Sequence, residues 1–324
     1  MNETVLNSYS ASLNSVIPLS IASILSFAGF LYLLWFIAAQ EIPKRSMTNG
    51  EISSQPESSK SIIAVTFTPL NNALAVMALS LTGYYLTSAI KMYPSGLSFD
   101  VNNALISVFL AFSESSYVYY AWKRGIFVVR HVFPRFGEWV AKSIIIVPPL
   151  VLVQAFPSIV LCYMKSRNHL DFYTKPYLDA NDLLTGFSGL VVVIFDLILL
   201  TAFIKFMKKT KVIDSDIVTD EKLVIVARYG IGAISLSLSM LFCYGIYLVF
   251  TVLAFYTISQ LLVGSMLILL LRMKVLLFQQ EEEERKILEI RITKQGRASV
   301  ESKAGEGMRT STATVGTLKR GLGV

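Results

Sequence analysis

Three ionisable residues of this chain, Glu114, Asp196 and Arg228, lie deep within strongly apolar segments. A charged side chain at the centre of a bilayer costs at least about 2.5–3.5 kcal/mol on insertion scales, so it normally faces a partner or a water-filled cavity. Two carboxylates beside one guanidinium leave a surplus negative charge, which a proton or a cation would neutralise. The three residues therefore predict one of two things: a charge cluster that holds helices together, as static glue or as a two-state lock, or a group on an ion path.

Position along the chain places these residues at a similar depth. Counting 1.5 Å per helical residue puts Glu114 and Asp196 each roughly 20 Å from the outer end of its segment, and Arg228 in the same inner third. Asn71 and Asn72, which follow Pro69, reach a similar depth in an earlier segment. We therefore expect Glu114 and Asp196 to share Arg228 in an interior polar cluster that also contains the two asparagines.

The segment that holds Glu114 carries further polar residues at helical spacing. Asn103, Ser107, Tyr117 and Arg124 recur with Glu114 on one face of a predicted helix. A polar stripe of this kind is expected to turn towards the interior of a helix bundle rather than towards lipid. Similar stripes are expected at Arg228, Gly232, Ser235 and Ser239, and at Tyr256, Gln260 and Gly264.

The composition indicates that these segments cross a membrane. The 324 residues are 54% hydrophobic and only 16% charged, whereas soluble chains average about 45–50% apolar and 25% charged residues. The net charge of +7 comes from short basic runs between apolar blocks, so it indicates topology rather than nucleic-acid binding. With two cysteines, two histidines and no nucleophile or paired-aspartate motif, we expect no metal site, no cofactor and no enzymatic activity.

Seven apolar segments are long enough to span a bilayer, which needs about 20 residues each. They are 15–39, 62–90, 101–122, 139–163, 183–204, 223–245 and 251–276, with the last two divided near Gly245 to Thr251. The predicted fold is an all-α membrane protein, a seven-transmembrane helix bundle over 15–278. Its lipid-facing surface makes the bilayer its first partner.

The loop charges predict the orientation of this bundle. Most loop lysines and arginines fall on one side if residues 1–14 are extracellular, so the C-terminus is expected in the cytosol. Asn2 then begins a glycosylation acceptor on the outer side. Residues 279–294 predict a cytosolic helical extension, and 295–324 a disordered cytosolic tail. That tail offers three possible phosphorylation sites: Ser299, Thr310 and Ser311.

A ligand pocket is expected towards the outer half of the bundle. Pro148 and Pro149 should kink the fourth segment, because proline removes a helical hydrogen bond, and Gln154 lies beside this kink. Most aromatic residues near the outer ends belong to an interfacial belt, but some can line an apolar pocket. The possible pocket residues are Gln154, Tyr163, Tyr173, Tyr244 and Gln260.

Seven spans, an outer N-terminus, basic inner loops and a Ser/Thr-rich tail resemble the architecture of the G-protein-coupled receptors. The family's common motifs do not occur: "YAWKRG" ends the third segment, and the seventh contains "AFYTISQLLVGS". The resemblance implies an orphan receptor at the plasma membrane that passes an unknown small ligand's signal to a G protein or another cytosolic signalling protein. The partner-facing residues would be Arg124, Lys208, Lys209 and Lys211.

A second reading remains open. A proton- or ion-coupled secondary transporter would use Glu114 or Asp196 as the carrying group. Repeat symmetry and helices broken around a midplane site would favour it. No internal sequence repeat is visible.

Overall fold

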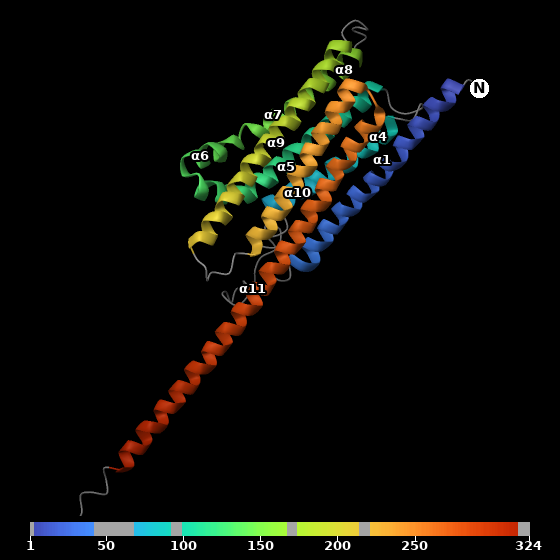
Figure 1. Cartoon of the computed structure of the whole chain (residues 1–324). Helices are drawn as coiled ribbons and strands as arrows, with labels where there is room; N and C mark the ends of the chain where they lie inside the picture. The colour runs from blue at the N-terminus through green and yellow to red at the C-terminus, as the bar shows by residue number, and fades with distance from the viewer. Residues whose placement is uncertain (1–2, 42–67, 92–98, 167–173, 214–220, 317–324) are drawn as a thin grey trace, which may run out of the picture. The chain divides into compact units, whose positions relative to one another are not determined.

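The computed structural model describes residues 3–41, 68–91, 99–166, 174–213 and 221–316, and these are almost entirely helical (Figure 1). The elements are α1 (Glu3–Phe36), η1 (Ile37–Glu41), α4 (Pro69–Lys91), α5 (Phe99–Val132), α6 (Pro134–Ser143), α7 (Val147–Val153), α8 (Phe156–Ser166), α9 (Thr174–Ile213), α10 (Glu221–Phe250) and α11 (Leu253–Gly316). The chain divides into a unit of residues 1–273 and a unit of residues 274–324, with α11 belonging to both.

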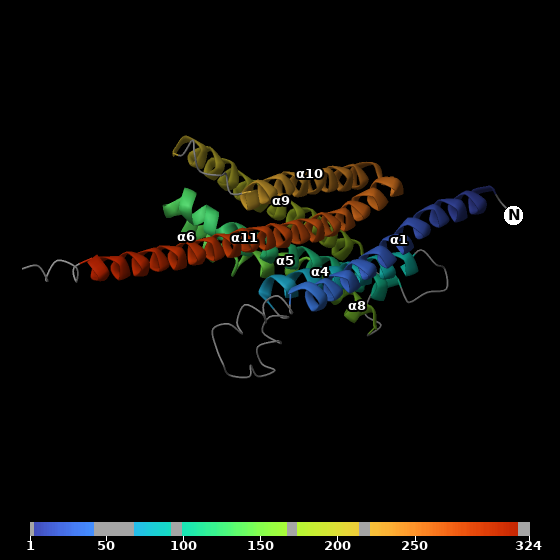
Figure 2. The ribbon, with the colours of Figure 1, turned by 90° about the horizontal axis from the view of Figure 1, so that it is seen from below.

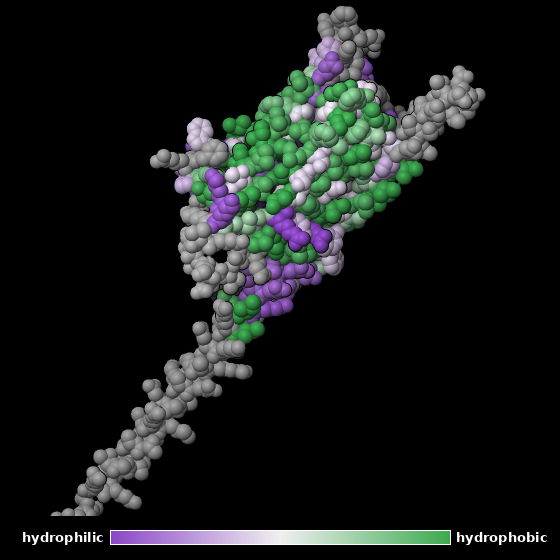
Figure 3. Space-filling model, viewed as in Figure 1, coloured by the Kyte–Doolittle hydropathy of each residue, from purple (hydrophilic) through white to green (hydrophobic). Residues whose placement is uncertain are grey.

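Within the described residues, six stretches are long and apolar enough to cross a membrane. They are Ser15–Glu41, Pro69–Lys91, Gly137–Ser166, Asp179–Lys208, Val224–Phe250 and Leu253–Leu288. Many large apolar side chains on them are exposed, such as Ile24, Phe242 and Val249, and Figure 3 shows hydrophobic residues over much of the visible face of the first unit. Apolar surface on this scale suits contact with lipid rather than water. The chain is a helical, multi-pass membrane protein.

The third predicted segment, 101–122, forms most of α5 but is not among these six. Polar residues such as Asn102, Asn103 and Glu114 lower its hydropathy. Even so, α5 has 34 residues, about 50 Å at the rise of an α-helix, and it packs against α4, α6, α7, α8 and α9. A helix surrounded by others needs less apolar surface than one that faces lipid, so its polarity is consistent with its central place.

The fourth predicted segment is broken twice, which confirms the expected kink. Residues 144–146 separate α6 from α7, and residues 154–155 separate α7 from α8. Pro148 lies in the first turn of α7 and Pro157 in the first turn of α8. Proline is tolerated in a first turn, where the missing N–H would have no helical partner. The prolines therefore start new helices, and the break after α7 leaves Gln154 beside α5.

The first unit places helices from both halves of the chain side by side. Helix α4 packs between α1 and α5, and α9 packs against both α5 and α10. Figure 2 shows the early residues of α11 running between these two groups. Three close contacts fix that part of α11: an added Cβ would lie within 3.3 Å of Leu271 at Gly29, of Leu269 at Gly232 and of Tyr85 at Gly264.

The division between the sixth and seventh predicted segments is confirmed. α10 ends at Phe250 and α11 begins at Leu253, so the reversal falls at the end of the expected stretch. Thr251 forms this chain reversal with a φ of 54°, and its N–H donates to the Tyr247 carbonyl over 2.7 Å. A left-handed residue is a common way to end a helix and free the chain to turn.

Helix α11 extends further than expected. It includes the predicted extension 279–294 and continues to Gly316, over residues that were expected to form a disordered tail. No proline occurs between Leu253 and Gly316, and proline is the residue that stops a helix most effectively.

Candidate functional site

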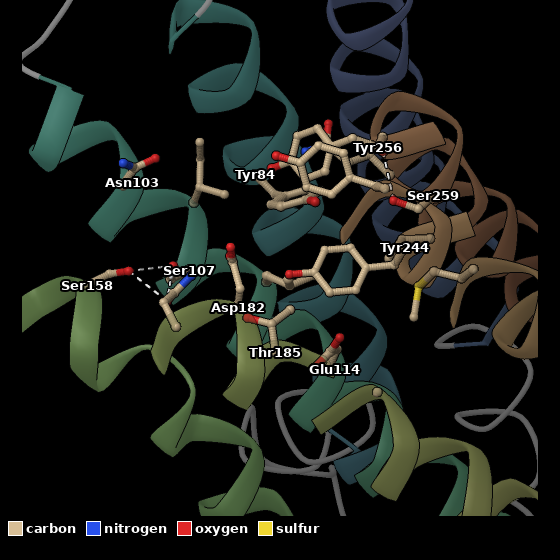
Figure 4. Close-up of a pocket in the computed structure, with 18 of the residues that line it drawn as sticks. Tyr84, Asn103, Ser107, Glu114, Ser158, Asp182, Thr185, Tyr244, Tyr256 and Ser259 are labelled. Carbon is tan, nitrogen blue, oxygen red and sulfur yellow. Dashed lines mark hydrogen bonds between the residues drawn. The ribbon is translucent and has the colours of Figure 1, made fainter. Parts of the chain in front are cut away.

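A cavity of about 380 Å³ lies between helices α4, α5, α8, α9, α10 and α11. We call it the Glu114 cavity, because Glu114 lies deepest along α5 among the residues that line it. Lys91, the last residue of α4, and Leu253, the first of α11, line its other end. The cavity thus extends from the end of the bundle at which α5, α9 and α11 begin to about the middle of α5. Figure 4 shows its side chains.

One wall of the Glu114 cavity is the polar stripe of α5. Asn103, Ser107 and Glu114 follow one another along the helix on the cavity side (Figure 4). The Ser107 and Ser158 hydroxyls both donate to Oδ1 of Asn181, over 3.1 and 2.7 Å. This network joins α5, α8 and α9. The expectation that the α5 stripe faces the interior is confirmed.

The opposite wall is aromatic. Tyr84 of α4, Tyr244 and Tyr247 of α10, and Tyr256 of α11 line the cavity. The ring centroids of Tyr247 and Tyr256 lie 4.9 Å apart, and those of Tyr244 and Tyr247 lie 6.1 Å apart. Aromatic contacts of this kind hold rings in fixed orientations. The wall therefore presents rigid ring surface together with phenolic hydroxyls.

Glu114 is held by neutral donors only, among the interactions the structure describes. It is 8% exposed, and Oε2 accepts hydrogen bonds from Gln154 Nε2 and Ser188 Oγ, each 2.8 Å long. Gln154 reaches it from the break between α7 and α8, and Ser188 reaches it from α9. A buried carboxylate with neutral partners can accept a proton or bind a cation.

Other polar groups of the cavity are only partly satisfied by the described residues. Nδ2 of Asn103 and Oε1 of Gln260, whose side chain is 1% exposed, are buried with no hydrogen-bond partner among the described residues, and the Gln260 amide lies near the Tyr256 hydroxyl. A buried polar atom left in this way costs about 1–3 kcal/mol. The cavity is therefore equipped with donors and acceptors that a bound molecule could satisfy.

Asp196 forms a separate group with residues of the second half of α5 and of α10. Its Oδ2 accepts hydrogen bonds from the Tyr117 hydroxyl over 2.7 Å and from Ser237 Oγ over 3.2 Å. These residues lie on α9, α5 and α10, so one carboxylate oxygen joins three helices. We call this group the Asp196 clamp. Asp196 and Tyr117 also line a second cavity, of about 60 Å³, together with Arg124.

Arg228 does not take part in either group. It lies exposed on α10, and among the described residues neither Glu114 nor Asp196 forms an ion pair with it. The expected sharing of Arg228 by both acids is therefore corrected. Ala227, Ile234 and Ser237 form the buried face of α10. Arg228 follows Ala227 by one residue, about 100° around the helix, which turns it outwards.

The other polar residues of the stripe predicted on α10 also face outwards. Ser235 and Ser239 are exposed. Ser239 donates to the Ser235 carbonyl over 2.8 Å, so its hydroxyl is satisfied by its own helix. Serine can do this at four-residue spacing, which is why a serine stripe does not by itself mark the inner face of a helix.

None of the hydrogen bonds described by the structure joins Asn71 or Asn72 to Glu114 or Asp196. Asn71 is buried and donates to Glu41 Oε2 over 2.9 Å, whereas Asn72 is exposed. Glu41, 5% exposed, lies in η1 at the end of the first span. The sequence assigns it to an inner loop, so this buried acid was missed.

Arg124, expected to face a cytosolic partner, instead lines the second cavity. Its guanidinium lies over the Tyr120 ring, 4.7 Å from the centroid, and its Nη1 is buried with no hydrogen-bond partner in the described part of the chain. Arginine stacks well on aromatic rings, and that stacking accounts for the inward position. Lys208 is exposed on α9, as expected of a partner-facing residue.

The predicted pocket residues divide into three groups. Tyr244 and Gln260 line the Glu114 cavity, and Gln154 binds the Glu114 side chain. Tyr163 is 60% exposed on α8 and does not line the cavity, so its assignment is corrected; an aromatic ring near a helix end can equally face the interface with lipid. Tyr173 lies outside the described residues.

Several further predictions fall outside what the structure describes. These are the acceptor Asn2 and the side chains of Lys209, Lys211, Ser299, Thr310 and Ser311. Cys162 and Cys243 are free thiols, and within the described part of the chain no group of His, Cys, Asp and Glu could hold a metal ion.

Sequence reasoning missed several cavity and clamp residues. Asp182 was placed in a loop, and Tyr84, Tyr256, Ser188 and Ser237 were not chosen as site residues. Ser188 lies eight residues before Asp196 on the same helix, close to two turns, so helical spacing from Asp196 could have indicated it.

No protein-family model, curated protein or solved structure matches this chain.

Proposed function

We propose that this chain is a seven-helix membrane receptor that binds a small ligand in the Glu114 cavity and passes the signal to a cytosolic partner, expected to be a G protein. One observation carries the proposal: the acid of the ligand cavity and the three-helix clamp lie on adjacent turns of α5. Glu114 precedes Tyr117 by three residues, so they share a helix face and lie about 4.5 Å apart along the axis. A shift of α5 at the cavity thus reaches the clamp directly.

In this proposal α5 also crosses the membrane and brings the number of spans from six to seven. It runs between helices that can cross a membrane, and its length exceeds the roughly 30 Å of a bilayer core. Seven spans put the two termini on opposite sides. With the N-terminus outside, as the loop charges predict, the Glu114 cavity faces the outer side and the Asp196 clamp lies nearer the cytosol.

The mechanism acts through one carboxylate. A ligand donor at Oε1 of Glu114 draws negative charge and the carboxylate itself away from Oε2, which weakens the bonds from Gln154 and Ser188 that connect α5 to the α7–α8 break and to α9. Because α9 also carries Asp196, the altered α5–α9 contact favours release of Tyr117 or Ser237 from the clamp. A ligand shifts such an equilibrium only by its difference in affinity for the two states, and a partner that binds the released state completes the signal.

The test is signalling without ligand, read through a panel of G proteins in a heterologous cell. Asp196→Asn removes the charged acceptor of the clamp and is expected to raise signalling severalfold over wild type. Arg228→Ala is the matched control, because Arg228 is exposed on α10 and touches neither acid. Surface expression is equalised between variants. If the Asp196→Asn variant signals through no G protein of the panel more strongly than the Arg228→Ala variant does, the receptor proposal fails.

Proton-coupled transport is the second candidate, and one observation favours it. The helix pair α7–α8 is interrupted beside Glu114, and a residue of the interruption, Gln154, binds that acid. Transporters commonly place binding sites at broken helices. Here Glu114 and Asp196 would carry the proton in turn along α5. Uptake of solute that depends on a proton gradient, lost in both Glu114→Gln and Asp196→Asn, would favour this candidate over the receptor.

A further inference from the structure

We infer that the Glu114 cavity takes an organic cation with an aromatic body, its ammonium group against Glu114 and its ring against the tyrosine wall. This inference rests on the proposed function in one respect, that the cavity binds a small ligand. It adds the chemical class of that ligand, which neither receptor nor transporter function specifies.

The charges of the cavity are unequal. Two carboxylates, Glu114 and Asp182, line it, and among the described lining residues Lys91 is the one with a basic side chain. Lys91 and Asp182 lie within electrostatic range of each other, whereas the described partners of Glu114 are the neutral Gln154 and Ser188. Negative charge is therefore balanced at the helix-end side of the cavity and unbalanced at its depth. An ammonium group supplies the missing charge, and a carboxylate ligand would be repelled.

The hydrogen bonds leave room for that contact. Gln154 and Ser188 both donate to Oε2 of Glu114, and no described residue donates to Oε1. Figure 4 shows the Glu114 side chain below Asp182, Thr185 and Tyr244, pointing into the space they enclose. A charge-assisted N–H···O bond to Oε1 would be roughly twice as strong as a neutral one.

The remaining walls suit an aromatic body. The rings of Tyr244, Tyr247 and Tyr256 form a connected surface, which can stack on a ligand ring and attract a nearby cation. The volume of about 380 Å³ is at the small end of the range of ligand cavities, about 300–1,000 Å³. That size favours a compact ligand over a lipid or a peptide.

A second polar group on the ligand would meet Gln260. Its side chain is 1% exposed and lines the cavity beside Tyr256, and no described residue donates to its Oε1. This observation does not depend on Glu114 or Asp182, because Gln260 lies on α11 and carries no charge. A buried amide left open in this way indicates that a ligand hydroxyl or amide completes the site.

The experiment measures the melting temperature of the purified full chain in detergent with three probes of matched shape: phenethylamine, phenethyl alcohol and hydrocinnamate. At saturating concentration we expect phenethylamine to raise the melting temperature by about 2–4 °C. The neutral and anionic probes are expected to give no comparable shift. Glu114→Gln is expected to abolish the phenethylamine shift.

Glu41→Gln is the matched control. Glu41 is also a buried carboxylate bonded by a side-chain amide, that of Asn71, but it does not line the cavity. It should retain the full shift, whatever its own melting temperature. If Glu114→Gln does not fold, the melting-temperature shifts that the three probes give on the wild-type protein provide the test. A shift from the alcohol or the acid that equals or exceeds that from phenethylamine overturns the inference.

The outcomes separate this inference from the proposed function. A shift from the neutral or anionic probe shows that the cavity binds ligands but not cations, so the inference fails while the receptor proposal stands. No shift from any probe also overturns the inference, and signalling by the clamp variants still tests the receptor. Silent clamp variants beside a phenethylamine shift that Glu114→Gln abolishes would reject the receptor and keep the cation site.

Discussion

Tyr117 on α5 donates a buried hydrogen bond of 2.7 Å to Asp196 on α9. The same carboxylate oxygen accepts from Ser237 on α10 over 3.2 Å. Helices α5 and α9 are also joined by the Ser188–Glu114 and Ser107–Asn181 hydrogen bonds. Apolar packing between helices is weaker as a constraint, because lipid can replace it with little change in free energy. A shared acceptor is directional, so it fixes the relative rotation of the helices and can be broken in one step.

Removing the Tyr117 hydroxyl should destabilise the bundle. Tyr117→Phe keeps the ring and removes the donor, and it should lower the free energy of unfolding by about 1–3 kcal/mol because a buried charged acceptor loses a partner. The measurement is the melting temperature in detergent. Tyr119→Phe, two residues along the same helix, is the control and should change it little. Equal melting temperatures for both variants would contradict the clamp.

Gly264 permits the close approach of α4 and α11. A Cβ there would lie 2.6 Å from the Tyr85 hydroxyl oxygen and 3.3 Å from Cζ, and Tyr85 is fully buried with its hydroxyl donating to the Gln260 carbonyl. Gly264→Ala should therefore destabilise the protein by about 1–3 kcal/mol through overpacking. In a Tyr85→Phe background the same change should have a much smaller effect, because the clashing oxygen is gone.

Melting temperatures of the four proteins in this cycle provide the test. The two substitutions share one contact, so their effects should not add. Simple additivity would mean that Tyr85 does not lie against Gly264.

Thr251 is expected to be improved by glycine. Its φ of 54° is a left-handed conformation that costs an L-residue about 1–2 kcal/mol, and a β-branched side chain fits it poorly. Thr251→Gly should raise the melting temperature. Thr201→Gly, an exposed threonine in the right-handed helix α9, should lower it by removing helix propensity. A lower melting temperature for Thr251→Gly would show that the reversal has another conformation.

The number of spans decides the positions of the termini. If α5 crosses the bilayer, an epitope tag at the N-terminus should bind antibody on intact cells, and a tag at the C-terminus only after permeabilisation. The control is a cytosolic marker that must stay unlabelled in intact cells. Both tags on the same side would mean six spans and would place α5 differently.

Hydrophobic patterning predicted the helices well because a membrane helix has one dominant requirement, a long apolar stretch. The predicted segments at 139–163 and 183–204, for example, lie within candidate spans of the structure, and Pro148 and Pro149 predicted a kink in the fourth segment. The crossing of α5 could not be decided in this way. Its polar residues are covered by other helices, and coverage is a tertiary property that hydropathy does not contain.

The sequence predicted some residues of the candidate site but not which of them contact one another. Glu114, Tyr117 and Asp196 were chosen correctly as interior polar residues, because an acid in an apolar segment is costly. Arg228 was assigned to them from its depth and from the stripe of small and polar residues that it begins on its helix. Depth fixes the height of a residue in the bundle but not the direction of its side chain, and Arg228 points outwards while Gln154, from a helix break, reaches Glu114.

The central claim is that the Glu114 cavity and the Asp196 clamp act as one device. Ligand-free signalling of Glu114→Gln, Tyr117→Phe and the double variant, at matched surface expression, tests it most directly. Each single change should raise signalling, because each loosens a contact between α5 and α9, and the double variant should rise no further than the stronger single one. Normal surface levels with no rise in either single variant, or fully additive rises, would contradict the claim.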